Sequence, residues 1–211
     1  MKQSLITQQN NHVFICGITR SGKTYFAKEA AKRIKSPVLF FNVQEENLGS
    51  PFQDFGPFDD PAQLRRQLRK GAKIDFRFWD LSGKQIQIVI GFLINSIMRD
   101  RDFSENRPIY IIIDEAQILS GPGLEAAIAA STRGLARGVR LICISQRPAL
   151  VDKTIYTQAQ EQYLFRLATS EGQYLKNKGI DYDYCLKTWE ELGKYSYIYT
   201  DGFTMEGRPA I

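Results

Sequence analysis

The segment at residues 17–24 constrains this chain more than any other feature of its sequence. It reads Gly-Ile-Thr-Arg-Ser-Gly-Lys-Thr and fits the pattern G-x-x-x-x-G-K-[ST]. A short apolar run at residues 13–16 precedes it, and residues 22–35 follow with small and apolar side chains on one helical face. A glycine-rich loop between a buried strand and a helix can turn its backbone N–H groups toward phosphate oxygens. The segment therefore predicts a nucleotide-binding loop.

The residues of this loop have separate predicted parts in holding a triphosphate. Lys23 should reach the β and γ phosphates, and the hydroxyl of Thr24 should ligate Mg²⁺. The N-terminus of the following helix adds a partial positive charge. ATP and Mg²⁺ are the predicted cofactors. The predicted nucleotide-binding residues are Gly17, Ile18, Thr19, Arg20, Ser21, Gly22, Lys23, Thr24 and Tyr25.

A second signal is the apolar run at residues 109–113, which ends in two adjacent acids, Asp114 and Glu115. We expect Asp114 to hold Mg²⁺ opposite Thr24, because phosphates and water supply most of the ligands of this ion. Glu115 should orient and polarise the attacking water. A single acid at a strand end is more often solvated surface. The pair of acids downstream of a phosphate loop instead predicts hydrolysis of the nucleotide.

A glutamine and two arginines complete the predicted catalytic set. Gln146 ends the buried run at residues 139–145, which we expect beside the strand that ends in the two acids. An amide there can donate to the γ-phosphate or hold the water. Arg133 and Arg137 lie near the end of a predicted helix over residues 122–137, and either could neutralise developing charge in a neighbouring subunit. Each arginine taken singly is at least as well explained as a surface or ion-paired residue. The predicted catalytic residues are Glu115, Lys23, Gln146, Arg137 and Arg133.

Strand-like and helical patterns alternate along most of the chain, which predicts an α/β fold with a mostly parallel sheet covered on both faces. Residues 38–43 and 74–79 predict further strands, and residues 84–99 and 153–160 predict helices. Residues 44–59 carry glycine and proline at intervals and predict a loop.

The last third of the chain continues this pattern and then changes. A short strand is predicted over residues 163–167, and residues 195–206 predict a β-hairpin with a tight turn at Asp201-Gly202. We assign one domain to residues 1–211. Its core would cover about residues 10–170, and a helical segment with the hairpin would cover about residues 171–211.

Composition narrows the class of protein without deciding its function. The chain has 211 residues, which suits one domain, and 28 Lys and Arg against 23 Asp and Glu give a net charge of +5. This surplus permits nucleic-acid binding but does not show it. The basic run at residues 64–73 could contact DNA phosphates, although a solvated helix face is the commoner meaning of such a run.

Cysteine and histidine usage excludes some kinds of site. The three cysteines are far apart in the sequence, which argues against a disulfide framework or a zinc site and favours a reducing cytoplasm. The only histidine, His12, cannot build a metal site by itself. Residues 1–11 are polar, and the longest apolar stretch, residues 86–98, is too short to span a bilayer. We therefore expect a soluble protein of the host-cell cytoplasm.

Together, three segments resemble the FtsK/HerA superfamily. They are residues 17–24, the tetrapeptide Asp-Glu-Ala-Gln at residues 114–117, and Val-Arg-Leu-Ile-Cys-Ile-Ser-Gln-Arg-Pro at residues 139–148. The resemblance covers about residues 10–170, and its most diagnostic element is the Ser-Gln-Arg-Pro strand end. It implies a RecA-like (ASCE) P-loop core, a ring of six subunits with ATP–Mg²⁺ sites at subunit contacts, and translocation of double-stranded DNA. It also implies that Gln146 is a sensor and that an arginine near Arg137 is the finger.

Within the superfamily, the compact chain resembles the genome-packaging ATPases of membrane-containing viruses with double jelly-roll capsids. The sequence shows neither the N-terminal barrel of HerA nor the membrane segment and winged helix of FtsK. This resemblance implies a viral packaging motor, associated with the virion, whose partners include capsid or membrane-vertex proteins.

Four alternatives stay open at this point. A HerA-like DNA-repair translocase shares the same motifs, and a Zot-like assembly ATPase of filamentous phages usually carries a membrane anchor. A small-molecule kinase would need an arginine-bearing lid. A nucleotide-binding switch would hold ATP without turnover, which the retained Lys23, Asp114 and Glu115 disfavour.

Overall fold

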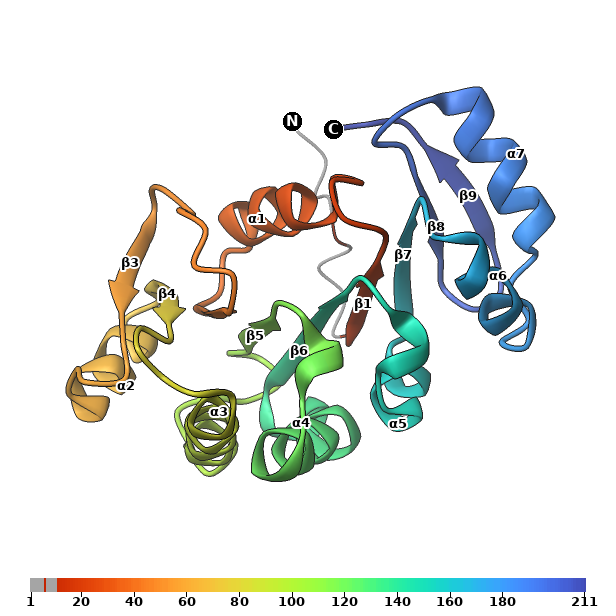
Figure 1. Cartoon of the computed structure of the whole chain (residues 1–211). Coiled ribbons are helices and arrows are strands. Elements are labelled where there is room, and N and C mark those ends of the chain that lie inside the picture. Colours follow the sequence, from red (N-terminus) through yellow and green to blue (C-terminus); the bar gives the residue numbers. More distant parts are fainter. Residues whose placement is uncertain (1–5, 7–10) are drawn as a thin grey trace.

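A computed structural model describes residue 6 and residues 11–211 (Figure 1). Its centre is one nine-stranded sheet of order β3-β4-β2-β5-β6-β1-β7-β8-β9. The strands from β3 to β7 in this order run parallel to one another. Strand β8 pairs antiparallel with β7, and β9 pairs antiparallel with β8. The predicted α/β class with a C-terminal hairpin is confirmed. The strands are β1 Val13–Cys16, β2 Val38–Asn42, β3 Phe52–Phe55, β4 Lys73–Arg77, β5 Ile109–Ile113, β6 Val139–Ser145, β7 Glu161–Phe165, β8 Tyr197–Thr200 and β9 Met205–Arg208.

Helices cover both faces of this sheet. The α-helices are α1 Lys23–Arg33, α2 Pro61–Arg69, α3 Gly83–Met98, α4 Gly121–Arg133, α5 Lys153–Gln158, α6 Thr169–Lys176 and α7 Tyr182–Leu192. The apolar side of α1 packs on one face, and α2 to α7 contribute to a core on the other face. Side chains of β5 alternate between the two cores. Ile111 packs in the core to which α2 to α7 contribute, and Ile112 packs in the core beneath α1.

The structure differs from the sequence predictions at three places. The predicted loop over residues 44–59 contains the edge strand β3, which pairs with β4 and shows too little buried character to be recognised. The predicted helix over residues 122–137 ends at Arg133, and a short 3₁₀ turn, η2 (Leu135–Arg137), follows. The predicted tight turn is a longer loop, because the carboxylate of Asp201 accepts hydrogen bonds from the N–H groups of Phe203 and Thr204 at 3.0 and 2.8 Å.

Strand register brings the ends of three parallel strands to one edge of the sheet. Strand β6 lies between β1 and β5, with Cys16 opposite Ser145 and Ile113 opposite Cys143. The predicted proximity of the strand at residues 139–145 to the strand that ends in the two acids is thus confirmed. The phosphate loop, the acids and Gln146 all leave the sheet at this edge, where ligands of open α/β sheets bind.

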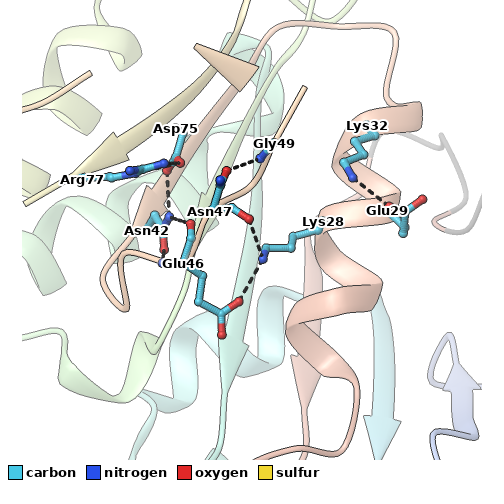
Figure 2. A network of polar contacts seen from close by, with 9 residues as sticks. All are labelled: Lys28, Glu29, Lys32, Asn42, Glu46, Asn47, Gly49, Asp75 and Arg77. Carbon is cyan, nitrogen blue, oxygen red and sulfur yellow. Dashed lines mark hydrogen bonds and ion pairs between the residues drawn. The ribbon is translucent and has the colours of Figure 1, made fainter. Parts of the chain in front are cut away.

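A network of polar contacts ties the loop after β2 to β4 and to α1 (Figure 2). Asn42 donates to the carboxylate of Asp75 at 2.9 Å, and Arg77 pairs with the same carboxylate at 2.9 Å. Lys28 of α1 binds Glu46 at 2.9 Å from the other side of the loop. Because both ends of this segment are tied down, the residues between Asn42 and Glu46 have defined positions at the site edge.

Within the part of the chain that the structure describes, no helix combines the length and apolar character that a bilayer span requires.

Candidate nucleotide site

The phosphate loop owes its shape to glycines at two positions. Gly22 precedes α1 with φ of 100°, a conformation that residues with a Cβ rarely adopt. At Gly17, an added Cβ would lie 2.6 Å from the Cβ of Phe165. The loop is held between two strands, because Gly17 N–H donates to Ser145 O at 3.1 Å and Ile18 N–H donates to Arg166 O at 2.8 Å. The predicted strand–loop–helix setting is present.

Lys23 is a buried cation at the first position of α1. Its residue is only 4% exposed, and burial lowers the pKa of the ammonium, while the carboxylates of Glu115 and Asp114 oppose this change. A buried ammonium beside a helix N-terminus provides a strong binding site for phosphate oxygens.

Asp114 has the environment of a ligand for a hard cation. It is fully buried; one carboxylate oxygen accepts from the N–H of Glu115 at 3.1 Å, and the other has no partner among the described residues. Burial raises the pKa of Asp114 to about 7, with a further contribution from the charge of Glu115. An orphaned buried oxygen of this kind is costly unless a donor or metal satisfies it. Asp114 therefore fits the predicted role of a Mg²⁺ ligand, and the role of Thr24 stays a prediction.

Glu115 is held by three amide side chains. Its backbone has φ of 57°, in the left-handed region, and the residue is 6% exposed. One carboxylate oxygen accepts from Gln44 and from Gln146, and the other accepts from Gln117. Donors on both oxygens fix the rotamer of this carboxylate in a strained backbone position, which is common at catalytic sites.

Gln146 connects the phosphate loop with Glu115. Its Oε1 accepts from Thr19 Oγ1 at 2.6 Å, which orients the amide so that Nε2 donates to Glu115. The Gln117 amide, which also donates to Glu115, is held in turn, because Ser145 Oγ donates to Gln117 Oε1 at 2.7 Å. The structure therefore brings together the predicted loop, both predicted acids and Gln146.

Two of the three amides around Glu115 were not predicted as site residues. Gln117 belongs to the Asp-Glu-Ala-Gln segment used for the family resemblance, where it had no assigned role. Gln44 follows β2 by two residues and lies in the segment that the sequence predicts to be a loop. Its position just beyond a buried parallel strand was a usable signal, because all such strand ends meet at the same edge.

No protein-family model and no curated protein matches this chain. Solved structures do match it. The genome packaging NTPase B204 from Sulfolobus turreted icosahedral virus 2, in complex with ATP-gammaS, superposes with a TM-score of 0.64 at 18% identity, covering 97% of this chain and 100% of that one. B204, the DNA-packaging ATPase from Sulfolobus turreted icosahedral virus, gives a TM-score of 0.63 at 17% identity, with 96% and 98% of the two chains covered. The chain shares the fold of B204. The likeness to viral genome-packaging ATPases that the sequence predicts is confirmed at the level of the fold.

A third match is more distant than B204. The conjugation coupling protein TcpA of pCW3, with ATPgS, superposes with a TM-score of 0.58 at 12% identity. The match covers 96% of this chain but only 60% of the TcpA chain. The match to B204 covers nearly all of both chains. It therefore extends over the tail helices and the hairpin as well as the phosphate loop and the two acids.

The two predicted arginines lie far from their own chain's phosphate loop. Arg133 ends α4 and Arg137 lies in η2, both just before β6 begins, whereas the loop meets the other end of β6. A seven-residue strand spans about 20 Å. Arg137 also donates to the carbonyl of Met98 at 3.0 Å. Neither side chain can serve its own site, so a role in a neighbouring subunit stays a prediction.

The basic run at residues 64–73 is largely engaged within the chain. Arg69 pairs with Asp100 at 2.9 Å and with Asp102 at 2.6 Å. Lys73 donates to the carbonyl oxygens of three residues at the end of α1, namely Ala31, Lys32 and Ile34. These contacts favour the structural interpretation of the run over a DNA-binding one.

Proposed function

We propose that this protein is an ATP-hydrolysing motor that moves double-stranded DNA, and that its task is the packaging of a viral genome. The observation that supports hydrolysis best is the Glu115 carboxylate, which three amide side chains hold at the strand edge that carries the phosphate loop. A site that only stored nucleotide would not require a carboxylate held on both oxygens beside the loop.

The proposed chemistry follows from the positions of these side chains. The loop amides and Lys23 bind the phosphates, and Thr24 and Asp114 are the residues that would hold Mg²⁺. The metal, when bound, neutralises charge on the β and γ phosphates. Glu115 accepts a proton from water as the water oxygen bonds to the γ phosphorus and the bond from that phosphorus to the ADP oxygen breaks. Gln146 holds the carboxylate in place and touches the loop through Thr19.

The DNA part of the proposal rests on the shared fold. The matched proteins are a genome packaging NTPase and a DNA-packaging ATPase, and the match extends over almost the full length of both chains. A positive net charge of +5 suits a partner with a phosphate backbone. We propose a ring of six subunits, acting in the host cytoplasm and at the virion with capsid or membrane-vertex proteins.

One experiment separates the motor from a non-hydrolysing switch. Phosphate release is measured with Mg²⁺-ATP alone, with duplex DNA and with single-stranded DNA of the same length. The motor should hydrolyse ATP, and duplex DNA should stimulate it more than single-stranded DNA does. Absence of hydrolysis under all three conditions would support the switch. The mass of the assembled particle, measured in the same buffers, tests the ring.

A further inference from the structure

A hollow of about 740 Å³ opens beside the phosphate loop. Its lining includes Lys23, Thr24 and Gln146, the groups assigned above to the triphosphate. The lining also includes aromatic and aliphatic side chains, which a triphosphate would not need. The volume falls within the range of pockets that hold a whole small ligand.

Exposed apolar side chains from three separate segments line the same hollow. Tyr25 lies in the first turns of α1, Tyr195 precedes β8, and Ile211 follows β9. They are 58%, 46% and 45% exposed, respectively. Isolated exposed apolar residues are ordinary, but a group that lines one hollow next to polar groups is characteristic of a ligand site.

Tyr195 is held in an unfavourable backbone conformation. Its φ is 70°, which is rare for a residue with a bulky side chain. The preceding turn enforces it, because the buried Ser196 donates to the carbonyl of Gly193 through its N–H at 3.3 Å and its hydroxyl at 2.7 Å. Strain of this kind persists where the surrounding structure fixes a side chain in a functional position.

The Tyr195 ring borders the phosphate loop directly. A Cβ added to Gly22 would lie 3.2 Å from Tyr195 Cδ1, so the ring borders the residue that precedes α1. The ammonium of Lys194 lies 4.7 Å from the centre of the same ring. An electron-rich aromatic face is therefore fixed at the mouth of the phosphate site.

We propose that Tyr195 is the platform on which the base of the bound nucleotide stacks, with Tyr25 and Ile211 enclosing the base. This inference rests on the proposed function, because the base reaches the hollow only when its phosphates occupy the loop. Stacking on an aromatic ring does not depend on hydrogen bonds to a particular base, so a tyrosine hydroxyl is not required.

Calorimetry with two ligands tests the proposal. Dissociation constants of Mg²⁺-ATP and of Mg²⁺-tripolyphosphate, which lacks the sugar and base, are measured for the wild type and for Tyr195→Ala, Tyr195→Leu and Tyr195→Phe. Tyr195→Ala should weaken ATP binding about 5- to 100-fold. Tyr195→Leu should weaken it as well, since leucine keeps an apolar contact with Gly22 but has no aromatic face. Tyr195→Phe should bind ATP like the wild type, and tripolyphosphate affinity should be the same in all four proteins.

Phe203→Ala is the matched control, because it removes an aromatic side chain that is 97% exposed in the hairpin loop and does not line the hollow. It should change neither dissociation constant. Unchanged ATP affinity in Tyr195→Ala and Tyr195→Leu would overturn the proposal, as would equal losses for ATP and tripolyphosphate. A wild-type protein that binds neither ligand would overturn the proposed function itself, and the base platform with it.

Discussion

The side-chain amide of Gln146 donates a hydrogen bond to the carboxylate of Glu115. Its oxygen accepts from the hydroxyl of Thr19 in the phosphate loop at 2.6 Å. One amide thus touches both the segment that would bind phosphate and the group that would activate water. A ligand that moves Thr19 would move the donor to Glu115 as well, which gives the site a direct route from nucleotide binding to catalysis.

Replacement of Lys23 by alanine should abolish measurable ATP binding. The buried ammonium is the main positive charge that the site offers to the phosphates. Titration calorimetry with Mg²⁺-ATP checks this result. Lys32→Ala, which removes a surface ion pair with Glu29 at 3.0 Å, is the control and should bind ATP normally. Wild-type affinity in Lys23→Ala would show that the loop does not hold the phosphates as proposed.

Glu115→Gln should retain ATP binding and lose hydrolysis. The amide is similar in shape to the carboxylate but cannot accept the proton of water, so the turnover number should fall by about 10²- to 10⁴-fold. Steady-state phosphate release and calorimetry measure the two effects separately. Glu190→Gln, an exposed acid of α7, is the control. Wild-type turnover in Glu115→Gln would remove Glu115 from its assigned role.

Thr19→Ala and Gln146→Ala should lower the turnover number by similar factors, and the double variant should be no slower than Gln146→Ala. The reason is that Thr19 acts on Glu115 through Gln146, so its contribution vanishes when the amide is absent. A double-mutant cycle on turnover numbers measures the coupling. Independent, multiplicative losses would contradict this relay.

Arg133 is the better candidate for a residue that acts on a neighbouring subunit, since no hydrogen bond or ion pair joins its guanidinium to the described part of the chain, whereas the side chain of Arg137 donates to Met98 O. Arg133→Ala should reduce hydrolysis by the assembled protein about 10³-fold without lowering its melting temperature. Mixing it with Glu115→Gln should restore part of the activity, because mixed rings recreate complete sites. Lack of rescue on mixing would exclude a role across the subunit contact.

His12 makes the stability of the protein depend on pH. Its Nδ1 accepts from the N–H of Leu141 at 2.9 Å, and burial, followed by the charge of Arg140, lowers the pKa of His12 from 6.5 to about 4. The unfolded chain therefore binds a proton before the folded chain does. The contribution is fully present above pH 6.5 and is lost as the pH falls toward 4, by about 3 kcal/mol in total.

Two measurements check this pH dependence. As the only histidine, His12 gives one imidazole titration curve by NMR, whose midpoint should lie well below that of a free histidine. The free energy of unfolding of His12→Asn, which keeps an acceptor near Leu141 N, should fall less than that of the wild type between pH 7 and pH 4.5. A midpoint near 6.5 would contradict the account.

The loop at residues 17–24 and the acids Asp114 and Glu115 could be identified from the sequence because each depends on local pattern. Glycines at fixed spacing permit one backbone path, and an apolar run of five residues that ends in two acids is typical of a buried strand leading into a polar site. The start of a helix also depends on local sequence. The Ser82 and Gln85 side chains form a capping box at the start of α3, close to the predicted boundary.

Tertiary structure decided the contacts between segments far apart in the chain. Nothing near Gln44 shows that it meets Glu115, and nothing near Tyr195 shows that its ring borders Gly22. Arg133 lies near the start of β6, whereas the phosphate loop of the same chain meets the end of β6. This separation likewise follows from strand direction. Local conformation depends on each residue and its neighbours, whereas these contacts depend on which faces of distant strands and helices bury each other, and only the folded chain as a whole settles that.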